Sequence, residues 1–192
     1  MPSPVYTLKP KIANVVLNVD PATAKVRPFV VAAILRNVKF DQATYKSFIQ
    51  LQDKLHQNIG KRRHIVSIGT HDMDTIKPPF LYTAQKPSDI KFEPLNETRE
   101  FTAEQLMDHY SKESHLKPYL SIIRDFDKYP VIYDSNGVVL SFPPIVNGNH
   151  SKIHLETKNV FIEITGTNLH KISVSLDTMV TMFSEYCADK FT

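Results

Sequence analysis

Residues 129–168 decide the fold, and they read YPVIYDSNGVVLSFPPIVNGNHSKIHLETKNVFIEITGTN. Two β-rich runs, 130–133 and 138–142, lie on either side of the Asn-Gly pair at 136–137, which is a strong signal for a tight β-hairpin. The Pro-Pro pair at 143–144 ends the second run, because proline cannot donate a backbone hydrogen bond to a neighbouring strand. The stretch therefore predicts an antiparallel hairpin, followed by a polar loop and a further strand.

That further strand, 159–167, alternates with a period of two. One face carries Val160, Ile162 and Ile164, and the other carries Phe161, Glu163, Thr165 and Thr167. A carboxylate on a strand otherwise built like a core strand requires partners, because burying an unpaired charge is costly. The pattern leaves two interpretations open. Either Glu163 lies on an exposed face or pairs with an Arg or Lys, or it is a single acceptor in the wall of an apolar pocket.

The composition suits a domain of ordinary size. The chain has 192 residues, enough for one sizeable domain and short of two. Its longest apolar runs, such as 29–35, fall far below the roughly 20 residues of a membrane-spanning helix, so no membrane association is expected. The N-terminus shows no signal-peptide pattern and the single cysteine, Cys187, suits a reducing compartment, which together favour a cytoplasmic protein. The net charge of +3 only weakly favours an RNA partner.

Helices alternate with further strands along the rest of the chain. Residues 29–35 are apolar on both faces, which predicts a central strand. Asp41 is a good N-cap for a helix over 42–58. Thr102 and Gln105 have the spacing of a capping box at the start of another helix.

A final helix is predicted over 174–188. The elements together indicate an α+β fold with a mixed or largely antiparallel sheet flanked by helices. We expect a single compact domain over 27–188, preceded by an extended lead-in over 1–26 that three prolines favour.

Motifs for several common chemistries are missing. The sequence contains no glycine-rich phosphate loop, no GxSxG, no HExxH and no paired CxxC, so nothing indicates ATP or nicotinamide binding. The His-Asp-Met-Asp run at 71–74 lacks the further ligands that a metal site needs, and we expect a turn without a metal. The basic run Lys-Arg-Arg-His at 61–64 has two interpretations, a solvated helix end or a contact with RNA phosphates.

The motifs of this chain closely resemble the β subunit of phenylalanyl-tRNA synthetase, of the eukaryotic cytosolic and archaeal type. The resemblance covers nearly the whole chain. Besides 130–167, it rests on RPFVVAAILRNVKF at 27–40, SFIQLQDKLHQNIGKRR at 47–63, GTHDMDT at 69–75, PSDIKFEPLN at 87–96 and TMVTMFSEYC at 178–187. In that family the region forms the third and fourth domains, an editing module that hydrolyses mischarged tyrosyl-tRNA(Phe). The resemblance thus implies that 27–188 is an editing domain.

The resemblance also implies a tyrosine-binding site. Glu163, in the motif Phe-Ile-Glu-Ile-Thr, would accept a hydrogen bond from the tyrosine hydroxyl. Phenylalanine would leave this acceptor unpaired, and a site of this kind can discriminate by roughly 10⁴-fold or more. Other implied tyrosine contacts are Thr165, Ser141, Leu140, Pro143 and Pro144, and the implied contacts to the tRNA 3′ end or the ester are Asn147, His150 and Ser151. The chain departs from the family pattern in having Asn168 where Asp is common, and Glu163 where some members have Asp.

The implied chemistry is ester hydrolysis by a positioned water, helped by the ribose hydroxyl and backbone amides, with His150 as a candidate general base. No metal or cofactor is expected for this module, and ATP and Mg would belong to the complete synthetase, whose ligase site this chain does not carry. The implied partners are the acceptor end of tRNA(Phe), tyrosine and a catalytic α subunit. The alternative is a non-catalytic module that binds tRNA or another subunit.

Overall fold

The hairpin expected around the Asn-Gly pair at 136–137 forms in the computed structural model, which describes residues 15–188. Strands β7 (Tyr129–Tyr133) and β8 (Val139–Phe142) pair antiparallel. Gly137 in the connecting turn has a φ of 79°, a left-handed conformation that glycine adopts without steric cost. The hairpin is therefore set by local turn chemistry.

The hairpin belongs to the larger of two main sheets, which has the order β1-β4-β7-β8-β9. Its other strands are β1 (Leu17–Val19), β4 (Phe80–Gln85) and β9 (Val146–Asn147). Only the β1–β4 pair in it is parallel, so the expectation of a mixed, largely antiparallel arrangement is confirmed. Most of the expected extended lead-in falls on residues 1–14, which lie outside the described residues.

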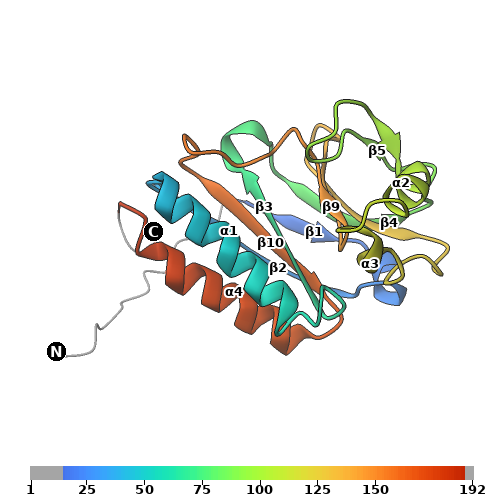
Figure 1. Cartoon of the computed structure of the whole chain (residues 1–192), viewed down its shortest axis with the longest axis horizontal. Helices are drawn as coiled ribbons and strands as arrows, with labels where there is room; N and C mark the ends of the chain where they lie inside the picture. The colour runs from blue at the N-terminus through green and yellow to red at the C-terminus, as the bar shows by residue number, and fades with distance from the viewer. Residues whose placement is uncertain (1–14, 189–192) are drawn as a thin grey trace.

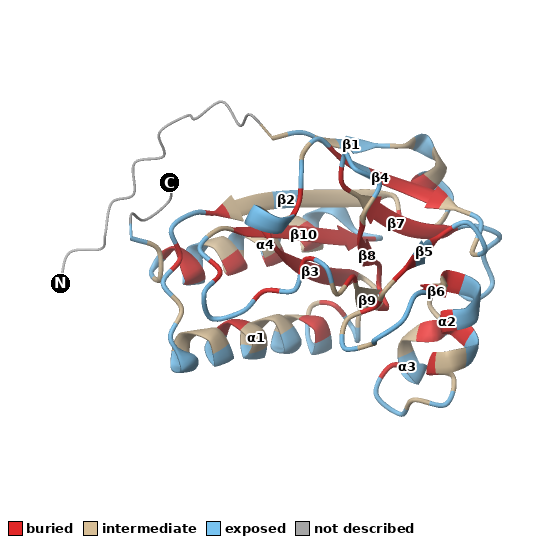
Figure 2. Ribbon diagram, turned by 90° about the horizontal axis from the view of Figure 1, so that it is seen from above, coloured by how far each residue is buried: buried red, intermediate tan, exposed pale blue. Residues whose placement is uncertain are grey.

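The second sheet holds the alternating strand at its centre. Strand β10 (Val160–Gly166) pairs antiparallel with β2 (Phe29–Leu35) on one side and β3 (Val66–Asp72) on the other. Both β10 and β3 are buried along their whole length, as Figure 2 shows. The prediction of a central position for 29–35 is wrong. This strand lies at an edge, because an apolar pattern on both faces does not distinguish an edge strand covered by other layers from a central one.

Two long helices cover one face of this sheet (Figure 1), α1 (Gln42–Gln57) against β3 and α4 (Leu169–Ser184) against β2 and β10. The core between helices and sheet includes Val160, Ile162, Ile164, Phe48, Met179 and Phe183. Asp41 caps α1 as predicted. Helix α4 begins five residues before the predicted start, because the side chain of Asn168 accepts a hydrogen bond from the backbone N–H of Lys171 and caps the helix there.

The opposite face of β10 packs against the larger sheet. Phe161 stacks on Phe80 with ring centroids 4.4 Å apart, and Tyr82, Ile132 and Leu140 complete this inter-sheet core. The division of β10 side chains between its two faces is therefore as the alternation predicts. The carboxylate of Glu163, which shares the face of Phe161, is directed into the space between the sheets.

The remaining elements form a third cluster at the end of the molecule away from the C-terminus (Figure 1). It contains β5 (Lys91–Phe92), β6 (Phe101–Thr102), α2 (Ala103–Tyr110) and the short α3 (Lys117–Leu120). The capping box between Thr102 and Gln105 is present. Short 3₁₀ helices η1 (Pro21–Lys25) and η2 (Met73–Thr75) complete the fold. Within residues 15–188, no helix is long and apolar enough to cross a membrane.

Candidate functional site

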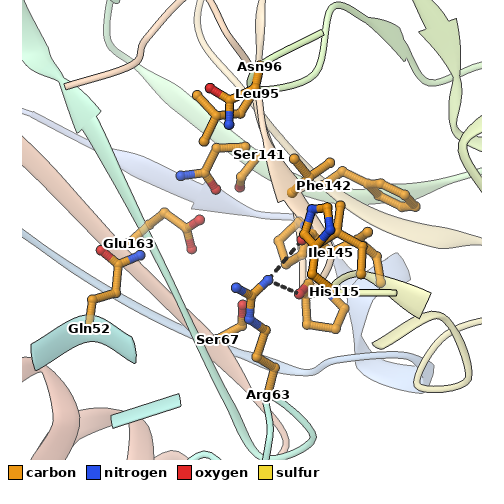
Figure 3. Close-up of a pocket in the computed structure, with 15 residues that line it drawn as sticks. Gln52, Arg63, Ser67, Leu95, Asn96, His115, Ser141, Phe142, Ile145 and Glu163 are labelled. Atoms are coloured by element: carbon orange, nitrogen blue, oxygen red, sulfur yellow. Dashed lines mark hydrogen bonds between the residues drawn. The ribbon is translucent and has the colours of Figure 1, made fainter. Parts of the chain in front are cut away.

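A cavity of about 210 Å³ lies between the two main sheets. One wall comes from α1, the turn after it, β3 and β10, and the rest comes from β8, β9, the turn between them and the loops at 95–96 and 115–116 (Figure 3). Its lining consists of Gln52, Arg63, Ser67, Leu95, Asn96, His115, Leu116, Ser141, Phe142, Pro143, Pro144, Ile145, Val146, Asn147 and Glu163. The cavity is thus assembled from segments that span more than a hundred residues of sequence.

Glu163 supplies the carboxylate in this wall and is only 2% exposed. Its Oε1 lies 3.8 Å from Nε2 of His71, and its Oε2 has no hydrogen-bond partner within residues 15–188. Gly69 lies directly opposite Glu163 on β3, and a Cβ at Gly69 would collide with Oε1. The glycine therefore leaves the space that the carboxylate occupies, and of the two interpretations of Glu163 the buried pocket acceptor is the one that the geometry fits.

The facing wall brings a second polar atom to the cavity. The hydroxyl of Ser141 is buried and, like the free oxygen of Glu163, lacks a partner in the described part of the chain. Pro143, Pro144 and Asn147 line the same wall, with Phe142 adding apolar surface. Four of the residues expected near tyrosine, Glu163, Ser141, Pro143 and Pro144, are thereby brought together.

Arg63 also enters the cavity, which the sequence did not indicate. Its Nη1 donates to the carbonyl oxygens of Pro144 at 3.2 Å and Ile145 at 2.9 Å, and its guanidinium lies 4.3 Å from the ring centroid of Tyr119. Its Nε is buried without a partner among the described residues, and burial lowers the pKa of Arg63. Figure 3 shows Arg63, Glu163 and Ser141 reaching the same space from different sides.

The backbone turn that directs Arg63 inward is unusual. Lys61, Arg62 and Arg63 have φ values of 45°, 53° and 65°, so three consecutive non-glycine residues adopt the left-handed conformation. No local sequence signal identifies such a turn. The basic run is therefore only in part a solvated helix end, because Arg63 is half-buried at the cavity while Lys61 is exposed.

Thr165, expected to contact tyrosine, lies further along β10 outside the cavity lining. Its Oγ1 accepts a hydrogen bond from Nε of the buried Arg27 at 2.9 Å, and its carbonyl oxygen accepts one from Nη2 at 2.9 Å. The same guanidinium donates to the carbonyl oxygens of His64 and Arg63. Burial lowers the pKa of Arg27 to about 10, although the nearby Tyr82 and Glu163 oppose this shift. Arg27 therefore connects β10 to the turn that carries Arg63.

Of the remaining expected site residues, Leu140, His150 and Ser151 lie outside the cavity lining. Leu140 is fully buried in the core between the sheets, and Asn147 lines the cavity. His150 is exposed, with Nε2 2.7 Å from the carbonyl oxygen of Thr75. Ser151 is buried and its Oγ lies 2.8 Å from Nδ1 of His71. Of the three residues expected at the tRNA 3′ end, only Asn147 is placed at the cavity.

A second buried histidine, His56, lies in the last turn of α1. Nε2 of His56 accepts a hydrogen bond from the backbone N–H of Ile68 at 2.8 Å. Burial, followed by the positive charges of Arg63 and Arg27, lowers the pKa of His56 to about 3. The ring is thus held neutral at physiological pH. Within residues 15–188, no group of three or more His, Cys, Asp or Glu is arranged to hold a metal ion.

The sequence is similar to the β subunits of phenylalanine–tRNA ligase from several organisms. The chain is 60% identical over 194 residues to the phenylalanine–tRNA ligase β subunit of Caenorhabditis elegans, an alignment that covers 100% of this chain and 33% of the relative. It is 62% identical over 170 residues to the human β subunit, covering 88% of this chain and 29% of the relative. The chain thus spans about a third of the length of these relatives.

A solved structure shares the fold. An N-terminal fragment of the phenylalanyl-tRNA synthetase β subunit from Pyrococcus horikoshii matches with a TM-score of 0.88 and 38% identity, covering 95% of this chain and 51% of the fragment. The resemblance inferred from the sequence motifs is therefore confirmed. The profile of the B3/4 domain matches residues 25–188. The chain accordingly belongs to the B3/4 domain family.

Proposed function

We propose that this chain is the editing module of a phenylalanine–tRNA ligase β subunit, and that it hydrolyses tyrosyl-tRNA(Phe). The observation that carries the proposal is the buried carboxylate of Glu163, which lines a cavity of about 210 Å³ and whose Oε2 has no hydrogen-bond partner among residues 15–188. This volume is below the roughly 300–1,000 Å³ of pockets for drug-sized ligands, so it suits one amino-acid side chain.

The cavity has the polarity that a phenol requires. Phe142, Pro143 and Pro144 offer apolar surface to a ring, while Glu163 and Ser141 offer acceptors to a hydroxyl. Phenylalanine would fill the same space but leave the carboxylate unpaired, and an unpaired buried acceptor carries a large penalty. Discrimination in favour of tyrosine by a factor of roughly 10⁴–10⁵ is attainable in this way.

The reaction is hydrolysis of the ester between tyrosine and the terminal ribose. A water attacks the ester carbonyl carbon, the tetrahedral intermediate collapses, and the ribose oxygen leaves and takes up a proton. Arg63 lines the cavity, and its guanidinium would stabilise the developing oxyanion or a terminal phosphate. No protein nucleophile is needed, and His150 is a weaker candidate for general base, because Thr75 already engages its ring.

The proposal also implies the partners of the chain. They are the acceptor end of tRNA(Phe), tyrosine as product and a catalytic α subunit, with no cofactor for the module itself. ATP and Mg are assigned to the complete synthetase. The Arabidopsis relative is named as cytoplasmic, and we propose the same compartment for this chain.

Deacylation of tyrosyl-tRNA(Phe) by the purified chain tests the proposal, with phenylalanyl-tRNA(Phe) as the matched substrate. We expect tyrosine release well above the spontaneous rate and little release of phenylalanine. Replacing Glu163 with Ala should slow tyrosine release by roughly 10- to 150-fold, as expected for loss of a hydrogen bond to a charged group.

The matched control is Glu156→Ala, which alters an exposed carboxylate away from the cavity and should leave the rate unchanged. A wild-type rate equal to the spontaneous one would reject the hydrolase. If the chain nevertheless bound tRNA(Phe), that result would favour the non-catalytic binding module.

A further inference from the structure

A buried side-chain series lies directly behind the cavity wall. Ser151 Oγ is 2.8 Å from His71 Nδ1, and His71 Nε2 is 3.8 Å from Glu163 Oε1. His71 and Ser151 are both 0% exposed, and Glu163 is 2% exposed. The mechanism above uses only the last of the three, so the first two have no assigned role.

The chemistry of the imidazole restricts where its proton lies. A carboxylate only accepts hydrogen bonds, so a bare Nε2 lone pair facing Glu163 would be repulsive. A serine hydroxyl can either donate or accept. If Ser151 donates to Nδ1 of His71, Nε2 carries the proton and directs an N–H at Glu163. Each contact then joins a donor to an acceptor, Ser151 to His71 Nδ1 and His71 Nε2 to Glu163.

No other side chain among the described residues donates a hydrogen bond to the carboxylate of Glu163. Within residues 15–188, Glu163 receives no side-chain hydrogen bond, and His71 Nε2 is itself buried without one. The distance of 3.8 Å between His71 Nε2 and Glu163 Oε1 exceeds the length of a hydrogen bond, about 2.7–3.2 Å, so the two atoms are close but not hydrogen-bonded. Contacts of this kind often tighten only when substrate is bound.

We infer that His71, oriented by Ser151, is a positioning residue that fixes Oε1 of Glu163 so that Oε2 is directed at the hydroxyl of tyrosine. The inference rests on the proposed editing function and assigns a role to the Gly-Thr-His-Asp motif. His71 does not touch the substrate. Its effect is on the geometry of the acceptor and therefore on the preference for tyrosine over phenylalanine.

Two substitutions of His71 separate this role from a purely structural one. In His71→Gln the amide nitrogen reaches the position of Nε2 and can donate to Glu163. In His71→Asn the amide reaches only the position of Nδ1, so the contact with Ser151 can persist while the donor to Glu163 is lost. The readout is the ratio of kcat/KM for tyrosyl-tRNA(Phe) to that for phenylalanyl-tRNA(Phe).

We expect His71→Asn to lower this ratio by about tenfold or more, and His71→Gln to keep it within a few-fold of wild type. Ser151→Ala should give an intermediate loss, because the ring is no longer oriented. Equal ratios in wild type and a folded His71→Asn variant would overturn the inference. So would equal losses in the Asn and Gln variants.

Nitrogen-15 NMR of the wild-type imidazole provides a test that does not depend on folding of a variant. A proton on Nε2, with a resonance that shifts when tyrosine but not phenylalanine is added, supports the inference. A neutral ring with its proton on Nδ1 overturns it. If the wild-type chain shows no preference for tyrosine, the proposed function fails, while the site of the proton still reports on the contact between His71 and Glu163.

Discussion

At the residue scale, the missing side chain of Gly69 is as important to the cavity as the carboxylate opposite it. A Cβ at this position would collide with Glu163 Oε1 and lie 3.1 Å from His71 Nε2. The glycine therefore keeps open the point where carboxylate and imidazole approach one another. An ordinary buried β-strand would favour a β-branched residue at this position.

Replacing Gly69 with Ala should displace the Glu163 carboxylate and abolish most of the preference for tyrosine. We expect a loss of stability of about 1–3 kcal/mol, typical of overpacking, which is measured by urea denaturation. Gly137→Ala is the matched control. Its Cβ would meet nothing within 4 Å, and its positive φ should cost about 1 kcal/mol without affecting discrimination. Unchanged discrimination in Gly69→Ala would contradict the assigned role of Glu163.

His56 gives the fold a dependence on pH. Its pKa is lowered to about 3 in the folded chain, chiefly by burial, whereas the unfolded value is near 6.5. Below pH 6.5 the unfolded state binds a proton that the folded state does not, so stability falls as the pH decreases toward 3. Between pH 6.5 and 5 we expect a loss of about 2 kcal/mol from this group.

Urea denaturation of wild type and His56→Gln at several pH values between 5 and 7 measures this contribution. The glutamine can accept the hydrogen bond from Ile68 N–H through its amide oxygen but does not titrate. We expect a shallower pH dependence in the variant. Identical slopes would show that other groups cause the acid sensitivity.

At the element scale, the end of β10 and the turn after α1 are joined by one buried guanidinium. Arg27 donates to Thr165 on β10 and to the carbonyl oxygens of Arg63 and His64 in the turn. The turn is conformationally costly, since residues 61–63 are left-handed, and it persists because these contacts hold it. Arg63 thus reaches the cavity through an element that Arg27 stabilises.

Arg27→Met should remove these hydrogen bonds and leave their buried acceptors unsatisfied. We expect a loss of about 3 kcal/mol or more in the free energy of unfolding, together with slower hydrolysis because Arg63 is released. Arg36→Met, on an exposed side chain just after β2, should change stability by no more than about 0.5 kcal/mol. Comparable stability in the two variants would show that Arg27 does not hold the turn.

At the scale of the whole molecule, the sequence predicts what is encoded locally. The hairpin around Gly137, the cap at Asp41 and the two faces of β10 depend on neighbouring residues, and they form as expected. The edge position of β2 could not be predicted, because it depends on which strands pair. Arg27 was also missed, since its acceptor Thr165 lies 138 residues away.

The candidate site shows the same division. Alternation placed Glu163 opposite the helix-facing side chains, but it left open whether that face met water or a cavity. The resemblance to a known family, rather than the residue pattern, singled out Ser141 and the two prolines, which the fold then brings near Glu163. Arg63 and His71 enter through tertiary contacts that no spacing in the sequence encodes.

The stacking of Phe161 on Phe80 has a consequence for how selectivity can change. These rings lie in the core between the two sheets that bound the cavity, so they affect its width from a position outside its lining. A bulkier pair of side chains at Phe80 and Phe161 would increase the spacing between the two sheets, and a smaller pair would decrease it. Neither change would remove a polar group from the cavity. On the proposed function, the preference among amino acids of different size can therefore be changed from the interior of the fold, without altering Glu163.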